Sequence, residues 1–464
     1  MSDVAASPPD PGATIRGKSY RVLLVFAALI GVLVSFASWC FLELVHWIQN
    51  EVYKSLPSGL GLHPVPWWWP LPVLTVAGAL AAVAIVRLPG NGGHIPYEGI
   101  KAGSAKPAEL PGILVAALAT LGLGLVLGPE APLIALGAGL AILAVQQVKK
   151  DTPDQVMAVL AASAAFAAIA TIFGSPVIGA IILIEAAGLG GPMLPLVLLP
   201  GLMSAGIGSV IFIGMGHWTG LSSSAYALSP FTLPAFSTLT VADFGWAIVL
   251  ALAAAAVTFA ITDGARRSAR VVARQPWLLL PVAGLAVAGL AIAFAQITPQ
   301  PADLVLFSGQ DAFGSLIKQA PTLSLSTLAF LLLFKGLAWS ISLGNFRGGP
   351  TFPALFIGAA GGLLAAHLPG FSETPAVAVL MAATAVSILK LPLSATVIAL
   401  LLTSKAGIAV APLIIVAVVV AYITIQTLSA ARGPAAPTKP AAQAQPAVPR
   451  PDTAPAASPA DGST

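Results

Sequence analysis

Charged residues are scarce in this sequence. Asp, Glu, Lys and Arg make up only 8% of its 464 residues, while hydrophobic residues make up 57%. Soluble globular chains carry about 25% charged residues, so this composition excludes a water-soluble globule of this length. The chain is therefore predicted to be an integral protein of the cell membrane that crosses the bilayer many times.

The stretches without charge are long enough to span a bilayer. Not one Asp, Glu, Lys or Arg occurs between Glu185 and Asp243, and similar gaps cover residues 131–148 and 155–184. A spanning helix needs roughly 20 apolar residues. These runs are rich in Leu, Ala and Gly and lack the alternating pattern of a membrane barrel, so an all-α fold is predicted.

Several residue types that carry chemistry are also missing. The single cysteine, Cys40, excludes an internal disulfide, and the five histidines are too scattered for a metal site. No GxxxxGK[ST] loop is present to bind ATP, and the apolar runs hold no paired nucleophile and base. We therefore expect no enzyme activity and no cofactor. The net charge of +4 comes mostly from basic clusters at 16–21 and 266–274, which mark cytoplasmic faces and give no reason to expect nucleic-acid binding.

Three regions are predicted along the chain: a cytoplasmic tail over 1–20, a membrane domain over 21–430 and a disordered Pro/Ala-rich tail over 431–464, with no cytoplasmic regulatory domain. Many of the expected helices are short or interrupted by Gly or Pro. Interrupted backbone at membrane depth is tolerated where it lines a polar pathway. Apolar helices are predicted near residues 21–48, 70–87, 111–126, 131–148, 155–172, 176–187, 193–215, 241–263, 277–297, 323–343, 351–368, 374–390, 392–404 and 408–430.

Two phrases in the sequence occur twice. GPEAPLIALGA at 128–138 and GPTFPALFIGA at 349–359 share five of eleven positions at an offset of 221 residues. GSPVIGAIILIE at 174–185 and KLPLSATVIALL at 390–401 align proline on proline at an offset of 216. Two echoes in the same order predict two structural halves, about 21–216 and 241–430, as in many transporters. The offset alone does not say whether the halves are inverted.

Each copy of the first phrase has the chemistry of a helix start, and only one copy is ionised. Gly and Pro precede an apolar helix, whose N-terminus presents free N–H groups and roughly half a positive charge. Glu130 is then a tethered anion at a site that attracts mobile anions. The alternative is a simple capping acid, worth roughly 0.3 to 1 kcal/mol, whereas a mid-membrane ionisable group costs roughly 2.5 kcal/mol or more. The functional interpretation is therefore favoured.

Four stretches resemble the chloride channel (CLC) family of anion channels and proton/anion exchangers. GNGGHIP at 90–96, GPEAP at 128–132, GGPTFP at 348–353 and the paired helix phrases correspond to that family's GSGIP, G(K/R)EGP, GxFxP and half-repeat helices. The resemblance implies two inverted-repeat halves and a homodimer in lipid with one anion pathway per subunit, and it makes Glu130 the gating glutamate. It also implies a set of anion-binding residues: Gly92, Gly93, His94, Ile95, Gly128, Ala131, Thr351 and Phe352.

The sequence departs from the family pattern at the anion site. The family serine falls at Gly93, or at Asn91 if the extra residue of GNGGHIP is placed differently. The basic residue before the gate is Pro129, and the family phenylalanine falls on Thr351. The tyrosine that closes the inner end of the pathway has no counterpart, since Tyr422 lies too early. Chloride is the expected anion, with fluoride or nitrate as alternatives. Four basic residues either attract anions by raising the local potential or, as is expected of most of them, serve as helix-end or topology charges: Lys101, Lys106, Arg347 and Lys390.

The sequence does not decide whether anion transport is coupled to protons. Exchangers of the family often carry a pair of acids after the first half-repeat helix, where this chain has Glu185 and Ala186. A missing acid favours a channel over an exchanger. Glu185 belongs either to a proton path or to the end of its helix, where it is structural. A secondary carrier for an organic solute and an intramembrane enzyme are the competing classes.

Overall fold

The computed structural model describes residues 11–100, 105–188, 190–191, 194–219 and 228–432. Nine helical segments in these residues are long and apolar enough to cross a membrane, which confirms the predicted all-α, multi-pass fold. The helices are α1 Pro11–Arg16, α2 Lys18–Asn50, α3 Leu56–Gly59, α4 Pro70–Arg87, α5 Leu110–Ala117, α6 Glu130–Val148, α7 Asp154–Phe173, α8 Pro176–Ala186, α9 Leu194–Thr219, α10 Val241–Val272, α11 Pro276–Ile297, α12 Phe313–Gln319, α13 Leu325–Asn345, α14 Thr351–Ala365, α15 Glu373–Leu389, α16 Pro392–Leu402 and α17 Ala411–Ala431.

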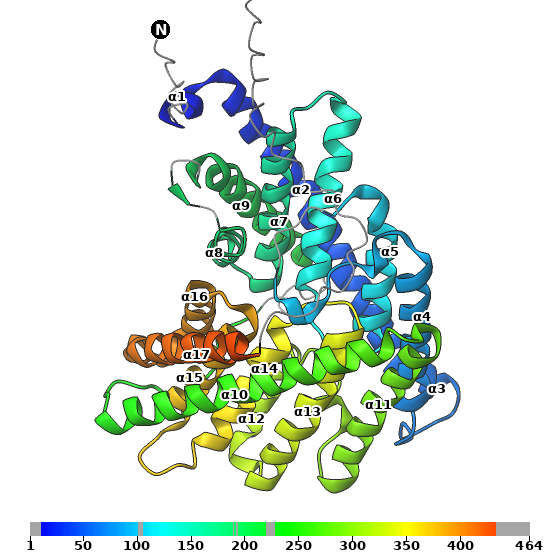
Figure 1. Cartoon of the computed structure of the whole chain (residues 1–464), viewed down its shortest axis with the longest axis vertical. Helices are drawn as coiled ribbons and strands as arrows, with labels where there is room; N and C mark the ends of the chain where they lie inside the picture. The colour runs from blue at the N-terminus through cyan, green and yellow to red at the C-terminus, as the bar shows by residue number, and fades with distance from the viewer. Residues whose placement is uncertain (1–10, 101–104, 189, 192–193, 220–227, 433–464) are drawn as a thin grey trace, which may run out of the picture.

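The helices form two groups, each built around one buried helix. In the first half α7 packs against α2, α6, α8 and α9, and in the second half α15 packs against α10, α14, α16 and α17 (Figure 1). Every residue of α15 except Glu373 is buried. A helix that is apolar on all sides belongs in the interior, so α15 and α7 are the cores of their halves.

The two halves repeat the same backbone path. Pro129 (φ −85°, ψ 0°) caps α6, and Pro350 (φ −90°, ψ −10°) caps α14. Gly174 and Lys390 then end α7 and α15 in the left-handed conformation, at φ 61° and 58°, just before α8 and α16 begin with proline. Both sequence echoes are therefore copies of one structural unit, as predicted.

Small residues let α14 lie against α15 with little space between the backbones. A Cβ on Gly358 would lie 2.6 Å from the Cα of Met381, and one on Gly362 would collide with the backbone of Val377. Close backbone approach through glycine is a common way to pack helices in membranes, where burial of apolar surface gives little driving force. It holds α14, and hence the N-terminus of α14, in a fixed place.

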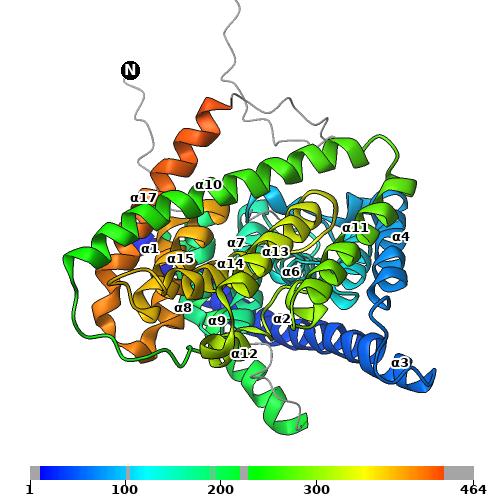
Figure 2. The ribbon, with the colours of Figure 1, turned by 90° about the horizontal axis from the view of Figure 1, so that it is seen from below.

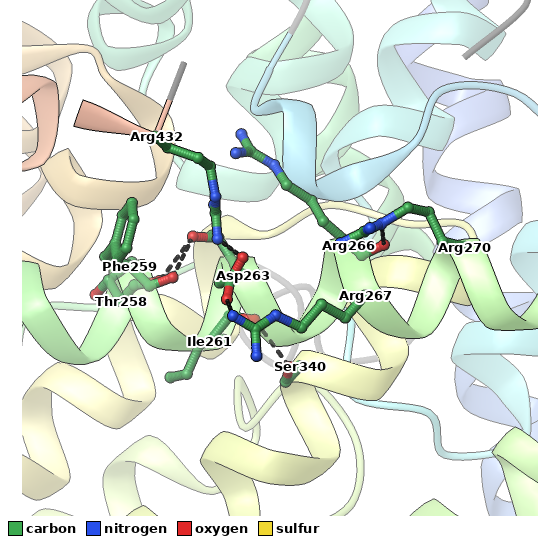
Figure 3. Close-up of polar contacts among 10 residues, drawn as sticks. Thr258, Phe259, Ile261, Asp263, Arg266, Arg267, Arg270, Ser340 and Arg432 are labelled. Atoms are coloured by element: carbon green, nitrogen blue, oxygen red, sulfur yellow. Dashed lines mark hydrogen bonds and ion pairs between the residues drawn. The ribbon is translucent and has the colours of Figure 1, made fainter. Parts of the chain in front are cut away.

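The end of α17 is tied to α10, which lies across the second half (Figure 2). Asp263 on α10 forms one ion pair with Arg267, at 2.6 Å, and a second one with Arg432 (Figure 3). The guanidinium carbon of Arg432 also lies 4.7 Å from the centre of the Phe259 ring. The basic end of α10 and the end of α17 thus share one face of the molecule.

Some elements differ from the sequence expectations. Two short helices, α1 and α12, were not predicted, and the first long helix begins at Lys18 and continues as a helical run to Gly59. The expected N-terminal tail over 1–20 therefore contains the helix α1. The expected disordered tail over 431–464 lies outside the described residues from position 433 onward, and the residues before it close α17.

Candidate anion site

The two copies of the GP phrase meet in the centre of the molecule. Gly128 N–H donates to the Gly349 carbonyl at 2.7 Å, and Gly349 N–H donates to the Gly128 carbonyl at 2.5 Å, forming an antiparallel bridge. A Cβ on either glycine would collide with the Glu130 carboxylate. The bridge therefore joins the halves and leaves just enough room for one carboxylate beside it.

Glu130 places its carboxylate at the start of a helix in the other half. It is the first residue of α6 and is fully buried. Its Oε1 accepts a hydrogen bond from the backbone N–H of Phe352 at 3.1 Å. Phe352 is the second residue of α14, so this N–H is one of the donors that have no partner within the helix. The carboxylate thus occupies the position that an anion takes at a helix N-terminus.

Two polar atoms beside this hydrogen bond have no partner among the described residues. They are Oε2 of Glu130 and Oγ1 of Thr351, and both side chains are fully buried. Phe352, the neighbour of Thr351, stacks on Phe173 at the end of α7, with ring centres 5.8 Å apart and planes 11° apart. A buried hydroxyl without a partner is uncommon, and here it can serve a ligand beside the α14 N-terminus.

Arg347 brings a positive charge to the same region from the second half. Its Nε donates to the Asn91 carbonyl at 3.2 Å, and its Nη1 donates to the Phe346 carbonyl at 3.2 Å. Its backbone N–H donates to Thr120 Oγ1 at 3.4 Å. Arg347 is buried and forms no ion pair within the described part of the chain. A guanidinium is always protonated, and the Glu98 carboxylate interacts with this charge electrostatically without forming an ion pair with it.

The GNGGHIP loop forms a tight turn next to Arg347. Gly92 has φ 71°, and a Cβ there would press on the Arg347 side chain at 3.2 Å, which explains the glycine. The neighbouring Gly93 packs against Ile113 of α5. Gly92 is thus the residue of this loop that lies against Arg347, just before the second-half phrase GGPTFP.

His94 is turned toward its own loop. One ring nitrogen, Nε2, lies 2.6 Å from the Gly99 carbonyl oxygen, and Nδ1 lies 3.9 Å from the Glu98 carboxylate. Ile95 follows it and precedes a short 3-10 turn, Pro96–Glu98. Ala131 is the second residue of α6 and is half-buried. The structure thus brings together Glu130, Gly128, Thr351 and Phe352 directly, and Gly92 through Arg347.

Glu185 lies at the junction of the other repeated pair of helices. Its Oε1 accepts from the Leu393 N–H at 2.8 Å, and its Oε2 accepts from the N–H and the hydroxyl of Ser394 at 2.7 and 2.6 Å. These donors belong to the first turn of α16. The carboxylate therefore caps α16, in the same way that Glu130 caps α14 across the two halves.

Sequence reasoning missed Lys335, which lies fully buried in α13. Its Nζ donates to the carbonyls of residues 304, 305, 306 and 307 at 2.9 to 3.3 Å and lies 4.5 Å from the centre of the Phe356 ring. The signal was available: Lys335 is the only charged residue in an apolar run over 325–345, and such residues are functional candidates by default. No group of three His, Cys, Asp or Glu side chains that could hold a metal ion occurs among the described residues.

Known proteins share this sequence pattern and this fold. The family model for the voltage gated chloride channel matches residues 98–426. A protein named "Putative ion-transport protein YfeO" from Escherichia coli O1:K1 / APEC is 28% identical over 364 residues, covering 76% of this chain and 81% of its own length. A protein of the same name from Shigella boydii serotype 4 (strain Sb227) is 27% identical over 364 residues, which again cover 76% of this chain and 81% of the relative.

Two solved structures superpose on most of the chain. A slow cyanobacterial Cl−/H+ antiporter matches with a TM-score of 0.71 at 19% identity, covering 88% of this chain and 94% of its own. A CLC-type fluoride/proton antiporter matches with a TM-score of 0.64 at 19% identity, covering 87% and 95%. At this identity the likeness establishes the fold, which is the arrangement that the repeated phrases predicted.

Proposed function

The chain belongs to the voltage-gated chloride channel family, and from that premise we propose that it exchanges small inorganic anions for protons through a pathway gated by Glu130. The observation that carries this proposal is the hydrogen bond from Phe352 N–H to the Glu130 carboxylate. It places a removable negative charge of the protein on a helix N-terminus in the protein interior. A mobile anion competes for the same donor.

The gating step follows from the charge of the carboxylate. Ionised Glu130 holds the α14 N-terminus and keeps an anion out by like-charge repulsion. When a proton neutralises it, the attraction to the N–H and to the helix dipole weakens, and the side chain is free to leave. An anion then takes the vacated position, with Thr351 Oγ1 as a neutral donor and Arg347 as the nearby positive charge.

Two findings help to distinguish a proton/anion exchanger from an anion channel. The sequence favoured a channel, because Ala186 stands where many exchangers have a second acid. Both superposed structures, however, are proton-coupled antiporters, and their likeness favours exchange. The contacts of Glu185 with α16 support a capping role for that residue, so we assign it no part in a proton path. The proposed exchange therefore relies on Glu130 as its proton-binding group.

We propose chloride as the anion, with fluoride or nitrate as alternatives that a flux assay separates. The fold neighbours include one chloride and one fluoride antiporter, so likeness does not decide between them. We also propose a homodimer in the lipid bilayer, with one pathway per subunit, as the resemblance implies. The mass of the protein in lipid nanodiscs tests the dimer.

The decisive experiment is anion efflux from liposomes with purified protein, recorded together with proton movement. Wild-type protein should drive protons against their gradient when chloride flows down its own. Glu130→Gln should abolish proton movement while chloride flux persists without pH dependence. Glu373→Gln is the matched control, since Glu373 is also an acid in the first turn of a helix but lies outside the bridge. Absence of flux for chloride, fluoride and nitrate alike would overturn the proposal, as would unchanged coupling in Glu130→Gln.

A further inference from the structure

A large cavity opens on one face of the molecule, away from the basic ends of α2 and α10. Its volume is about 720 Å³, and it lies between the end of α2, residues 228–232 and the segment from Asp303 to Lys318. The segment between α11 and α12 thus forms one wall, and the last turns of α2 form the other. The cavity wall exposes more apolar than polar surface, and its ionisable side chains are His46, Tyr53, Lys54, Asp303, Asp311 and Lys318.

A second, narrow pocket of about 50 Å³ shares a wall with this cavity. Both spaces are lined by His46, Gln49, Ser308, Gln310 and Asp311. The narrow pocket is also lined by residues that the large cavity does not reach: Leu42, Val45, Leu121, Leu127 and Pro129. Because Pro129 is the residue before Glu130, the narrow pocket extends from the cavity to the start of α6. A space of this size has room for a few water molecules.

The distribution of basic residues places this cavity on the outer side of the membrane. Arg16, Lys18 and Arg21 precede or begin α2, whereas His46 lies near its other end. A helix of this length spans roughly 50 Å, enough to cross the bilayer. The basic end of α10 precedes α11, which leads to the 303–318 segment on the opposite side. Both helices put the cavity opposite the basic, cytoplasmic face.

Among the cavity acids, Asp311 is the one that also lines the narrow pocket. Its side chain is exposed to the cavity and is surrounded on most sides by protein. This partial burial raises the pKa of the Asp311 carboxyl, while the nearby positive charges of His46 and Lys54 oppose the rise. Burial likewise raises the pKa of Asp303, against the charge of Lys54. The water of the cavity moderates both effects.

The other charged and titratable groups facing Asp311 have defined positions. Lys54 Nζ donates to Asn50 Oδ1 at 2.7 Å, and the Tyr53 hydroxyl donates to the Leu123 carbonyl at 2.9 Å. Lys318 lies in the last turn of α12 and is exposed. Asp303 lines the cavity and takes no part in the narrow pocket. His46 and Asp311 are therefore the two ionisable groups on the wall that continues toward Glu130.

We propose that Asp311, assisted by His46, takes protons from the outer solution and passes them to Glu130 through the narrow pocket. The step rests on the proposed exchange function. The Asp311 carboxylic acid gives up its proton, and the Glu130 carboxylate receives it through intervening water. Asp311 then regains a proton from the cavity. His46 offers a second proton-binding group on the same wall, and neither residue binds the anion.

The test records chloride flux and proton flux together in liposomes while the outer pH is varied. Asp311→Asn should lower proton flux roughly tenfold or more, since general acids contribute about 100-fold or more when they are well placed. Chloride flux should fall with it, because an anion enters only after Glu130 is protonated, and both fluxes should recover at low outer pH, where Glu130 is protonated without the relay. Asp311→Glu should restore proton flux with a shifted pH profile. Asp303→Asn is the matched control, because it removes an acid from the same cavity but not from the narrow pocket.

Each outcome decides the proposal. Wild-type proton flux in Asp311→Asn overturns it, and so does an equal loss in Asp311→Asn and Asp303→Asn, which would show a general effect of charge. A loss of chloride and proton flux that low outer pH does not reverse would assign Asp311 to anion entry instead. A wild-type protein that carries chloride without protons refutes the exchange function itself, and with it this route. The elution profile of each variant in detergent shows that it is folded.

Discussion

The backbone N–H of Phe352 donates to the carboxylate of Glu130, although the two residues lie 222 positions apart in the chain. The donor belongs to the helix start of the second half and the acceptor to the helix start of the first. One copy of the repeated phrase therefore supplies a helix N-terminus, and the other supplies the carboxylate that binds to it. A second ionised copy would put two carboxylates beside one bridge, where like charges repel.

The glycine at 349 makes room for the Glu130 carboxylate. Because a Cβ there would collide with the Glu130 carboxylate, Gly349→Ala should push that carboxylate away from the α14 N-terminus. Chloride flux should then lose its pH dependence, as expected for Glu130→Gln. Gly361→Ala is the control within α14, since its Cβ would make only an ordinary contact of 3.5 Å with Leu380. Wild-type pH dependence in Gly349→Ala would show that Glu130 is not held where the structure places it.

Arg347 has a structural role and an electrostatic role that two variants separate. Arg347→Met leaves the Asn91 and Phe346 carbonyls without their donor, which costs about 1 to 3 kcal/mol of stability. It also removes the positive charge, so the KM for chloride should rise roughly tenfold, equivalent to about 1.4 kcal/mol. Arg347→Lys keeps the charge but not the planar fork of donors. It should restore the KM while the melting temperature stays low. A wild-type KM in Arg347→Met would rule out the electrostatic role.

Lys335 holds the loop around residues 304–307, which forms part of the wall of the outer cavity. The three N–H groups of its ammonium serve four consecutive carbonyls, and those of Val305 and Leu306 are buried, with no water to bind instead. Lys335→Met should therefore destabilise the protein by about 3 kcal/mol, measured as a lower melting temperature in detergent. Lys318→Met, at an exposed position in the last turn of α12, should leave the melting temperature unchanged. Equal melting temperatures for the two variants would mean that the loop is held by other contacts.

The sequence predicted the gate because an acid in an apolar run is costly and therefore conspicuous. Glu130 stood out for that reason, and the repeated phrase placed it at a helix start. Arg347 did not stand out, because a basic residue at the end of an apolar helix usually marks topology. Its burial depends on Asn91, 256 residues away, and only the fold brings the two together. Lys335 was visible as the only charge in its apolar run, but its partners are backbone carbonyls, which no side-chain pattern marks.

Element length explains the remaining differences. The α12 helix has only seven residues, too few for a periodic pattern to distinguish it from a loop. Most long helices were predicted within a few residues, since their apolar runs are bounded by charges or prolines, but α10 continues to Val272, nine residues past its predicted end at 263. The narrow pocket beside Pro129 draws its walls from α2, the first-half phrase and the loop before α12. A space formed by three distant segments has no signature in any one of them.

Glu185 tests whether every acid at a helix junction of this fold carries protons. Its carboxylate accepts from two N–H groups and one hydroxyl at the start of α16. An amide has one oxygen, so Glu185→Gln should leave one of these donors without an acceptor and cost about 1 kcal/mol of stability. Proton coupling should stay at the wild-type level, because the carboxylate is engaged in capping. Ser394→Ala, which removes only the hydroxyl donor, gives the stability loss expected from one hydrogen bond. If Glu185→Gln abolished proton flux while its stability matched Ser394→Ala, Glu185 would belong to the proton path, and the capping contacts would be incidental to its role.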